Sequence, residues 1–396
     1  MPRSIFSRKI KLLHIITNLD YGGAPLALFG LLDRLDHHRY EMALATGLAP
    51  DSQRDLIDEA RKRGYQVIPI PSLVRQIDPV KDFLALCHLW RLIRSGGYDI
   101  IHTHKSKGGF LGRLAAKLAG APVIIHSPHG HVFEGYFGPA VSRLFLELER
   151  VAGRFSDKIV ALTESERNEY KAWRIGDERR VTVIPNGIDI ATYKRQGGNS
   201  QDKRAELGFS GREWIIATVG RLVPIKGHTY LIAALKRVIE KVPEARLWLI
   251  GDGPLRKALE EEVEALGMAR YVSFLGLRDD VPELLSAIDL FVLPSLNEGF
   301  GLVLIEAMVM EKPVVAFEVG GVPDIVIHGE VGLLVPARDV EALATAIISL
   351  EQDRALAKKM GQKGAMRVKA YFGIEVMVEK FESLYEGLLS SKVIGE

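Results

Sequence analysis

Short apolar runs alternate with amphipathic helical patterns along almost the whole chain. Runs rich in β-branched residues and bounded by polar turns are typical of buried parallel strands. The segments between them have the 3.6-residue period of helices that cover a sheet. This repeating order predicts an α/β protein assembled from βα units.

The predicted strands fall into two series that are separated by a break in the pattern. The first series comprises strands near 11–17, 41–46, 66–70, 99–103, 123–126, 158–162 and 182–184, with helical patterns at 25–35, 78–94 and 139–155. The second comprises strands near 214–220, 247–251, 272–275, 290–293, 313–317 and 332–335, followed by helices between 340 and 389. Glycines and charged residues at 190–211 predict the linker between two sheets.

Length and composition agree with two domains and with a reducing compartment. At 396 residues the chain exceeds what one core usually supports. Lysine and arginine total 52 against 50 for aspartate and glutamate, a balance of +2 that gives no reason to expect nucleic acid as a partner. The single cysteine, Cys87, allows no disulfide within the chain and favours a cytoplasmic location. No apolar run approaches membrane-spanning length, so any membrane contact is expected to be peripheral.

Polar residues and glycines follow several of the predicted strands. In parallel sheets ligands bind beyond the carboxyl ends of the strands, so these residues are the candidates for a site. Glu298 lies in a glycine-rich turn and Glu306 lies in the helix that follows it. A carboxylate accepts two hydrogen bonds at once, which suits the vicinal hydroxyls of a sugar, and the helix start suits a phosphate. The alternative is that Glu306 belongs to an ion pair and that Glu298 is a solvated loop charge.

Two cations bracket another strand-to-helix turn. Arg221 and Lys226 lie between a strand that ends near Gly220 and a helix that begins near His228, so both could bind one phosphate group. Gly22 and Gly23 also precede a helix and could let backbone N–H groups approach a phosphate. A pair of solvated cations and a plain turn are the simpler alternatives.

These motifs, taken in order, give the chain a clear resemblance. It resembles the retaining glycosyltransferases of family 4, which have the two-domain GT-B fold. The resemblance rests on Tyr21-Gly-Gly23, His102-Thr-His104, His129-Gly130, Pro185-Asn-Gly-Ile-Asp189, Gly220-Arg221 with Lys226-Gly227, Gly251-Asp-Gly-Pro254, and Glu298-Gly-Phe-Gly301 with Glu306. It implies two Rossmann-like domains facing across a cleft, residues 1–192 and 193–373, with a C-terminal helix at 374–396 crossing back to the first.

The resemblance also assigns roles to residues. Arg221 and Lys226 are expected to neutralise the diphosphate of a sugar nucleotide, Glu306 to hold its ribose, and Glu298 to hold the transferred sugar. His129 and Gly23 are expected to meet the donor from the first domain. The expected catalytic residues are Arg221, Lys226, Glu298 and His129. The expected donor-binding residues are Gly22, Gly23, Arg221, Lys226, Gly253, Arg278, Glu298, Gly299, Phe300, Gly301, Leu302 and Glu306.

No metal ion or other cofactor is expected, because no Asp-x-Asp pair offers two carboxylates to a divalent ion. The pairs His102-x-His104 and His129-x-His131 are open to a competing interpretation as metal ligands, since each places two histidines on one side of a strand. Histidines at strand ends that face an anionic ligand explain the same pattern.

The acceptor side is expected around His104, Lys105, His131 and Phe133. Lys105, Lys107 and Arg113, together with aromatics at 133–137, could meet an anionic membrane surface or a lipid-linked sugar. A solvated basic face beside packed aromatics is the alternative.

The predicted function is transfer of a hexosyl unit from a UDP- or GDP-sugar to a hydroxyl of a glycan or lipid-linked acceptor, with retention, in cell-envelope or exopolysaccharide synthesis. The expected location is the cytoplasm, with the inner face of the plasma membrane as a further site of action. The alternatives are a sugar-nucleotide epimerase or hydrolase and a non-catalytic sugar-nucleotide-binding protein. An NAD-dependent oxidoreductase is disfavoured because the first strand-to-helix turn, 18–23, lacks a Gly-x-Gly-x-x-Gly motif.

Overall fold

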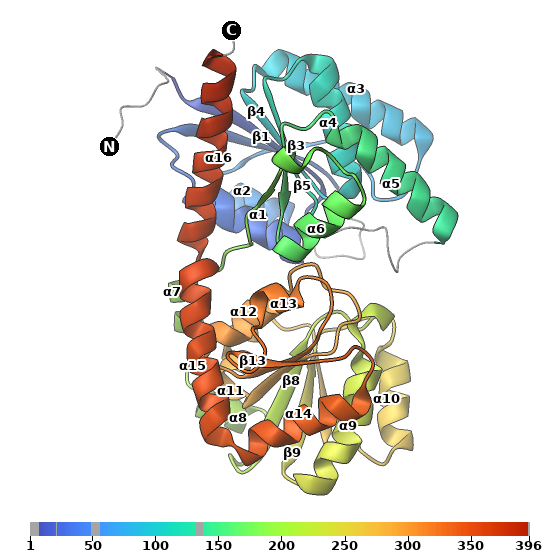
Figure 1. The fold of residues 1–396 in the computed structure, drawn as a ribbon, viewed down its shortest axis with the longest axis vertical. Coiled ribbons are helices and arrows are strands. Elements are labelled where there is room, and N and C mark those ends of the chain that lie inside the picture. The colour runs from blue at the N-terminus through green and yellow to red at the C-terminus, as the bar shows by residue number, and fades with distance from the viewer. Residues whose placement is uncertain (1–7, 21, 49–55, 131–137, 395–396) are drawn as a thin grey trace. The chain divides into compact units, whose positions relative to one another are not determined.

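The computed structural model describes residues 8–20, 22–48, 56–130 and 138–394 (Figure 1). The chain divides into two compact units. Unit 1 comprises Met1–Gly187 and Ile374–Glu396, and unit 2 comprises Ile188–Gly373. Each unit has its own parallel sheet, as the two series of apolar runs predict.

Unit 1 contains a seven-stranded sheet in the order β3-β2-β1-β4-β5-β6-β7. Its strands are β1 (Ile10–Asn18), β2 (Tyr40–Gly47), β3 (Gln66–Pro69), β4 (Ile100–His104), β5 (Val123–Ser127), β6 (Lys158–Ala161) and β7 (Val181–Val183). All neighbours pair in parallel. The order reverses between β1 and β4, which makes the carboxyl ends of these two strands the expected ligand site of unit 1.

The helices of unit 1 cover both faces of this sheet. They are α1 (Gly23–Arg34), α2 (Ile57–Lys62), α3 (Pro79–Gly96), α4 (Ser106–Ala119), α5 (Pro139–Gly153), α6 (Glu164–Ala172) and the short 3-10 helix η1 (Glu178–Arg180). The C-terminal helix α16 (Ile374–Ile394) belongs to the same unit and buries Met377, Phe381 and Tyr385 in a core shared with β1, β4 and β5. The aliphatic residues of the central strands are therefore buried on both faces of the sheet.

Unit 2 contains a six-stranded sheet in the order β10-β9-β8-β11-β12-β13. Its strands are β8 (Trp214–Val219), β9 (Ala245–Ile250), β10 (Val272–Gly276), β11 (Leu290–Leu293), β12 (Val314–Phe317) and β13 (Gly332–Val335). Its helices are α7 (Ile190–Gln196), α8 (Ser200–Glu206), η2 (Pro224–Lys226), α9 (His228–Lys241), α10 (Arg256–Ala265), α11 (Val281–Ala287), α12 (Leu302–Val309), α13 (Val322–Ile325), α14 (Val340–Gln352) and α15 (Arg354–Tyr371). Here the order reverses between β8 and β11.

The segment 190–211 differs from its prediction as a linker, because it contains the helices α7 and α8. Asp189 and Asn199 cap their first turns, with side chains that accept hydrogen bonds from Thr192 N and Gln201 N. The units divide at 187/188, whereas the prediction places the boundary at 192/193. Ile188 N donates to Phe372 O of the same unit at 2.9 Å. Among the described residues, no helix combines the length and apolar character that crossing a bilayer requires.

Candidate functional site

Lys226 and Glu298 form an ion pair at the carboxyl edge of the unit 2 sheet. Lys226 Nζ lies 2.5 Å from Glu298 Oε2, and Ser295 Oγ lies 3.4 Å from the same oxygen. The two loops that carry them are held together by a hydrogen bond from Leu296 N to Ile225 O of 2.8 Å. Lys226 follows β8 and Glu298 follows β11, so the pair sits where the strand order reverses. The structure thus unites two predicted residues that lie 72 positions apart.

Glu306 lies on α12, one turn into the helix after the Glu298 turn, and its side chain is partly buried. Burial raises the pKa of Glu306 to about 7, and a hydrogen bond with the Tyr193 side chain offsets part of this rise in the pKa. Tyr193 was not a candidate in the sequence, because it falls in the segment that the sequence indicates as a linker. The cap at Asp189 was the signal that a helix begins there.

Glycines determine the path of the Glu298 turn. Gly301 has φ 74° at the start of α12, and a Cβ on it would lie 3.2 Å from Glu298 Cγ. Gly320 has φ 49°, and a Cβ there would lie only 2.3 Å from Glu298 O. Gly321 N donates to this same carbonyl at 2.9 Å. Gly320 was missed in the sequence, although the Gly-Gly pair soon after a strand is a signal for a close backbone approach.

The other predicted donor residues of unit 2 lie around the same strand ends. Arg221 is exposed in the turn after β8, and Gly253 lies so close to Leu222 O that a Cβ would come within 2.5 Å of it. Gly299 and Leu302 lie in and directly after the Glu298 turn. The side chain of Phe300 is not open to a ligand, because its ring is buried. It packs on the ring of Phe372, with 5.7 Å between the ring centroids.

Arg278 follows β10 and is engaged with acidic side chains of its own unit. Its Nε lies 2.7 Å from Asp280 Oδ1 and its Nη2 lies 2.5 Å from Asp280 Oδ2. Glu206 lies 3.7 Å away, and Lys203 contacts both acids. Any ligand of the Arg278 guanidinium would therefore have to share it with Asp280.

In unit 1, the predicted glycines lie at the start of α1, directly beyond β1. Gly22 is the residue before the helix and offers no side-chain cap, so the first N–H groups of α1 are not satisfied by its side chain. Tyr21, the first residue of this motif, lies outside the described residues. Lys105 follows β4, has φ 61°, and pairs with Asp20 through a contact of 2.6 Å.

Two buried histidines, His14 and His104, form a hydrogen-bonded chain with the half-buried His129. His14 Nδ1 lies 2.9 Å from His104 Nε2, and His104 Nδ1 lies 3.0 Å from His129 Nε2. His129 has φ 58°, a left-handed conformation that is uncommon for a residue with a Cβ. Burial lowers the pKa of His129 to about 3, so at neutral pH its ring is an uncharged donor or acceptor. Its Nδ1 has no partner among the described residues.

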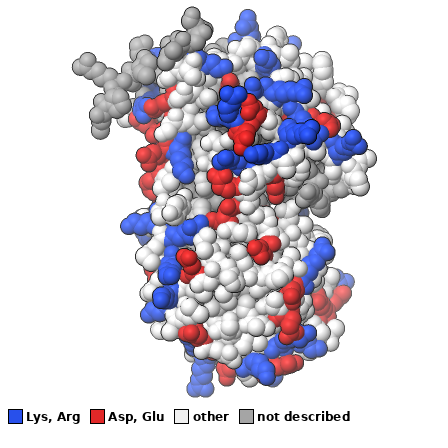
Figure 2. All heavy atoms as spheres, viewed as in Figure 1, with Lys and Arg blue, Asp and Glu red and all other residues white. Residues whose placement is uncertain are grey.

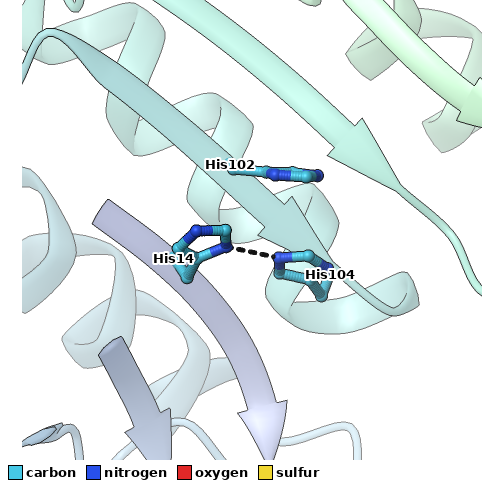
Figure 3. A group of neighbouring side chains, drawn as sticks. All are labelled: His14, His102 and His104. Atoms are coloured by element: carbon cyan, nitrogen blue, oxygen red, sulfur yellow. Dashed lines mark hydrogen bonds between the residues drawn. The ribbon is translucent and has the colours of Figure 1, made fainter. Parts of the chain in front are cut away.

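The competing metal interpretation can be tested on His14, His102 and His104, which lie together on β1 and β4 (Figure 3). One ring nitrogen of each lies within 4.8 Å of the others. Both nitrogens of His102 have partners, however, at 2.8 Å from Tyr385 OH and 2.8 Å from Ser127 Oγ. His14 and His104 bond to each other. Hydrogen bonds therefore account for the ring nitrogens of this cluster except His14 Nε2, which has no partner among the described residues. His131, from the second predicted pair, lies outside the described residues.

Of the three cations expected on the acceptor side, the prediction is wrong for Arg113, and the other two are paired with acids. Arg113 is fully buried, and its Nη2 lies 2.6 Å from Glu149 Oε2. Lys107 pairs with Asp82, and Lys105 pairs with Asp20. The sequence places these cations after a strand, but it does not reveal the acids that neutralise them. Phe133, like His131, lies outside the described residues.

Comparison with known proteins decides the family. Residues 22–187 match the model for the glycosyl transferase 4-like domain, and residues 199–367 match the model for glycosyl transferases group 1. The *Escherichia coli* UDP-Gal:alpha-D-GlcNAc-diphosphoundecaprenol alpha-1,3-galactosyltransferase is 31% identical over 82% of this chain and 84% of its own length. The chain belongs to the family 4 glycosyltransferases. The capsular polysaccharide biosynthesis glycosyltransferase CapM of Staphylococcus aureus is also similar. It is 26% identical to the present chain, and the match covers 84% of this chain and 88% of CapM.

Solved structures confirm the GT-B fold of this glycosyltransferase. Anabaena HepE in complex with UDP has a TM-score of 0.80 at 24% identity and covers 96% of this chain and 100% of HepE. Sucrose-phosphate synthase from Thermosynechococcus elongatus has a TM-score of 0.81 at 26% identity and covers 97% of this chain and 100% of its own. The expected fold class, two Rossmann-like domains of the GT-B type, is therefore correct.

Proposed function

We propose that this glycosyltransferase moves a hexosyl unit from a UDP- or GDP-sugar to a hydroxyl group of a glycan or lipid-linked acceptor, with retention of anomeric configuration. The observation that carries the proposal is the arrangement at the β8/β11 strand ends, where Lys226, Glu298 and Glu306 gather around one glycine-shaped turn. This is the part of a parallel sheet at which ligands bind. The named activities of relatives, which use UDP-galactose and GDP-mannose, support a sugar-nucleotide donor.

The cations supply what the leaving group needs. A nucleoside diphosphate departs only if its growing negative charge is stabilised, and Arg221 and Lys226 are proposed to bind that diphosphate. Lys226 is already oriented by Glu298 before any ligand arrives. The ammonium has three donor hydrogens, so it can contact a phosphate oxygen and Glu298 together. Glu298 is thereby proposed to place Lys226 and to accept hydrogen bonds from hydroxyls of the transferred sugar.

Glu306 and His129 are proposed to bind the remaining polar groups of the donor. Glu306 would accept hydrogen bonds from the two ribose hydroxyls in its ionised form. His129, kept neutral by burial and held by His104, would hydrogen-bond a hydroxyl of the sugar through Nδ1. In the retaining reaction proposed here, the bond between the anomeric carbon and the diphosphate oxygen breaks as the new glycosidic bond forms, and the leaving diphosphate accepts the proton of the acceptor hydroxyl. No protein side chain is then needed as a general base.

We propose the acceptor and the biosynthetic process from the names of the relatives. The E. coli relative is named for a GlcNAc-diphosphoundecaprenol acceptor and CapM for capsular polysaccharide biosynthesis. A polyprenyl-diphosphate-linked sugar is therefore the acceptor to test first, with a role in cell-envelope or exopolysaccharide synthesis. An enzyme acting on such a lipid would work at the cytoplasmic face of a membrane without crossing it.

The donor assignment can be tested by thermal denaturation with a panel of UDP- and GDP-sugars. A ligand at a hundred times its dissociation constant stabilises a fold by about 2.7 kcal/mol, which is a measurable shift. Lys226→Ala is expected to remove the shift, whereas Lys236→Ala, an exposed lysine on α9, should retain it. A panel without any shift for the parent protein would contradict the donor assignment.

Incubation with donor alone separates transfer from the rival chemistries of the fold. A transferase consumes donor only when acceptor is present, whereas an epimerase or hydrolase converts it without acceptor. Full conversion of the donor in the absence of acceptor would replace the proposal by one of these. His129→Ala provides a further distinction, because sugar transfer at the parental rate would remove His129 from the reaction.

A further inference from the structure

Unit 1 contains a cavity lined by arginines. Its volume is about 470 Å³, which is within the usual range of ligand pockets. Four guanidinium groups line it, from Arg150, Arg154, Arg174 and Arg180, against the single carboxylate of Asp177. Figure 2 shows Lys and Arg side chains gathered over the part of unit 1 that contains α5 and α6. No residue predicted for donor or acceptor binding lies in this lining.

The position of the cavity separates it from the proposed reaction site. Arg150 and Arg154 belong to the end of α5, which precedes β6, and Arg174 and Arg180 belong to the segment that precedes β7. The cavity thus lies toward the amino ends of these strands. His104 is the last residue of β4, and Gly22 and His129 lie beyond the carboxyl ends of β1 and β5. Parallel strands place these two ends at opposite edges of the sheet.

Two of the arginines are held in place by backbone carbonyls, and one of them, Arg150, also pairs with Glu147 outside the lining. Arg180 Nη1 donates to the backbone carbonyls of Arg154 at 2.9 Å and of Ser156 at 3.0 Å. Arg150 Nε donates to Trp173 O at 2.8 Å, while its Nη1 bonds to Glu147 at 2.6 Å. The carbonyls fix the orientation of each guanidinium and leave further N–H donors for a ligand.

The backbone brings the two arginine-bearing segments close together. A Cβ on Gly153 would lie 3.0 Å from Gly176 N, and Gly176 itself has φ 73°. Arg174 also has a positive φ, of 56°. Among the described residues, neither Arg154 nor Arg174 has an acidic or carbonyl partner for its guanidinium. Contacts with the carbonyls at the ends of α5 and α6 explain one donor each of Arg180 and Arg150, but they do not explain these two unpaired cations.

We propose that this arginine cavity binds a phosphate or diphosphate group, independently of the sugar-nucleotide donor. Guanidinium groups match the geometry of phosphate oxygens, and the excess of arginines over acids in the lining suits a multiply charged anion. Such a group is carried both by soluble phosphate compounds and by phospholipid headgroups. Helix α5 also exposes apolar side chains that could contact a membrane, namely Val141, Leu144 and Val151. The lipid source is therefore tested separately.

The test measures the rate of phenylglyoxal modification of each arginine by peptide mass spectrometry. Inorganic diphosphate is expected to slow modification of Arg154 and Arg174, while Arg91 and Arg94, exposed on α3, should react at an unchanged rate. Because the readout is assigned residue by residue, diphosphate bound by Arg221 does not confuse it. A second arm replaces diphosphate by phosphatidylcholine vesicles with or without phosphatidylglycerol. Neither arm measures enzymatic activity, so the result does not depend on the proposed function.

The variant Arg154→Gln/Arg174→Asn provides the second measurement. Asparagine tolerates the positive φ at 174, so the variant should fold. Loss of a charge-assisted hydrogen bond corresponds to roughly tenfold weaker binding, and the variant should abolish the protection of Arg180. Arg91→Gln/Arg94→Gln changes the net charge equally and should leave it intact. Protection by diphosphate or by the anionic vesicles supports the proposal and identifies the source. The absence of protection at Arg154, Arg174 and Arg180 in both arms overturns it.

Discussion

The replacement Glu306→Gln is expected to stabilise the ligand-free protein while weakening its binding to the donor. Burial raises the pKa of Glu306 from 4.5 to about 7 in the folded state. The unfolded chain loses this proton near pH 4.5, so above pH 7 the folded state alone holds a poorly solvated carboxylate. At 1.36 kcal/mol per pKa unit, this costs the folded state about 3 kcal/mol above pH 7 and nothing below about pH 4.5.

Thermal denaturation at pH 8 and at pH 4.5, each without ligand, measures this cost. For a unit of this size, 3 kcal/mol corresponds to an increase in Tm of roughly 6–12 °C as an upper value. Glu306→Gln should therefore approach this increase at pH 8 and show little change at pH 4.5. Glu330→Gln, on an exposed loop of the same unit, makes the same chemical change and should alter neither Tm.

Ionisation of Glu306 is also expected to control the binding of the donor ribose. If the ribose hydroxyls bind the ionised carboxylate, affinity for the donor must fall as pH decreases below 7, by about tenfold at pH 6. In Glu306→Gln the affinity should be weaker at pH 8 and independent of pH between 6 and 8. A variant that is no more stable than the parent at pH 8, or that keeps the parental pH dependence of affinity, would refute the reasoning.

Two further substitutions test the packing that positions the site and the core of unit 1. Gly320→Ala should cost about 1–3 kcal/mol and weaken donor binding, because its Cβ meets Glu298 O at 2.3 Å. Gly329→Ala has a similar φ of 76° but no atom within 4 Å, so thermal denaturation and donor titration should show a smaller loss of stability and parental affinity. Arg113→Met should cost about 3–5 kcal/mol in urea unfolding by leaving Glu149 buried without its partner. Arg113→Met/Glu149→Leu should recover most of that loss, and a double variant as unstable as the single one would contradict this account.

The strands and their strand-end residues were predictable from sequence for a simple physical reason. Strands such as β5 and β11 are buried on both faces, so their apolar runs are continuous and bounded by polar turns. Once the strands are located, the parallel arrangement places Lys226 and Glu298 at one edge of a sheet. Their direct pairing did not follow, because it depends on how two loops fold against one another across 72 positions.

The acids that neutralise predicted cations were beyond the reach of sequence reasoning. Arg113 lies on the inward face of α4 and meets Glu149 of α5, a partner 36 positions away. Spacing along one helix predicts neighbours three or four residues apart, but it cannot pair two helices. Tyr193 was missed for a different reason. The glycines at 197 and 198 are typical of a loop, so the segment was predicted as a linker although it contains two short capped helices.

The central claim is that the Lys226–Glu298–Glu306 arrangement supports retaining transfer from a sugar nucleotide. The measurement that tests it most directly is NMR analysis of the product formed from an α-linked UDP- or GDP-hexose and a polyprenyl-diphosphate-linked sugar. The account predicts a new α-glycosidic linkage and one nucleoside diphosphate released for each sugar transferred. A β-linked product, or no transfer from any donor that binds, would contradict it.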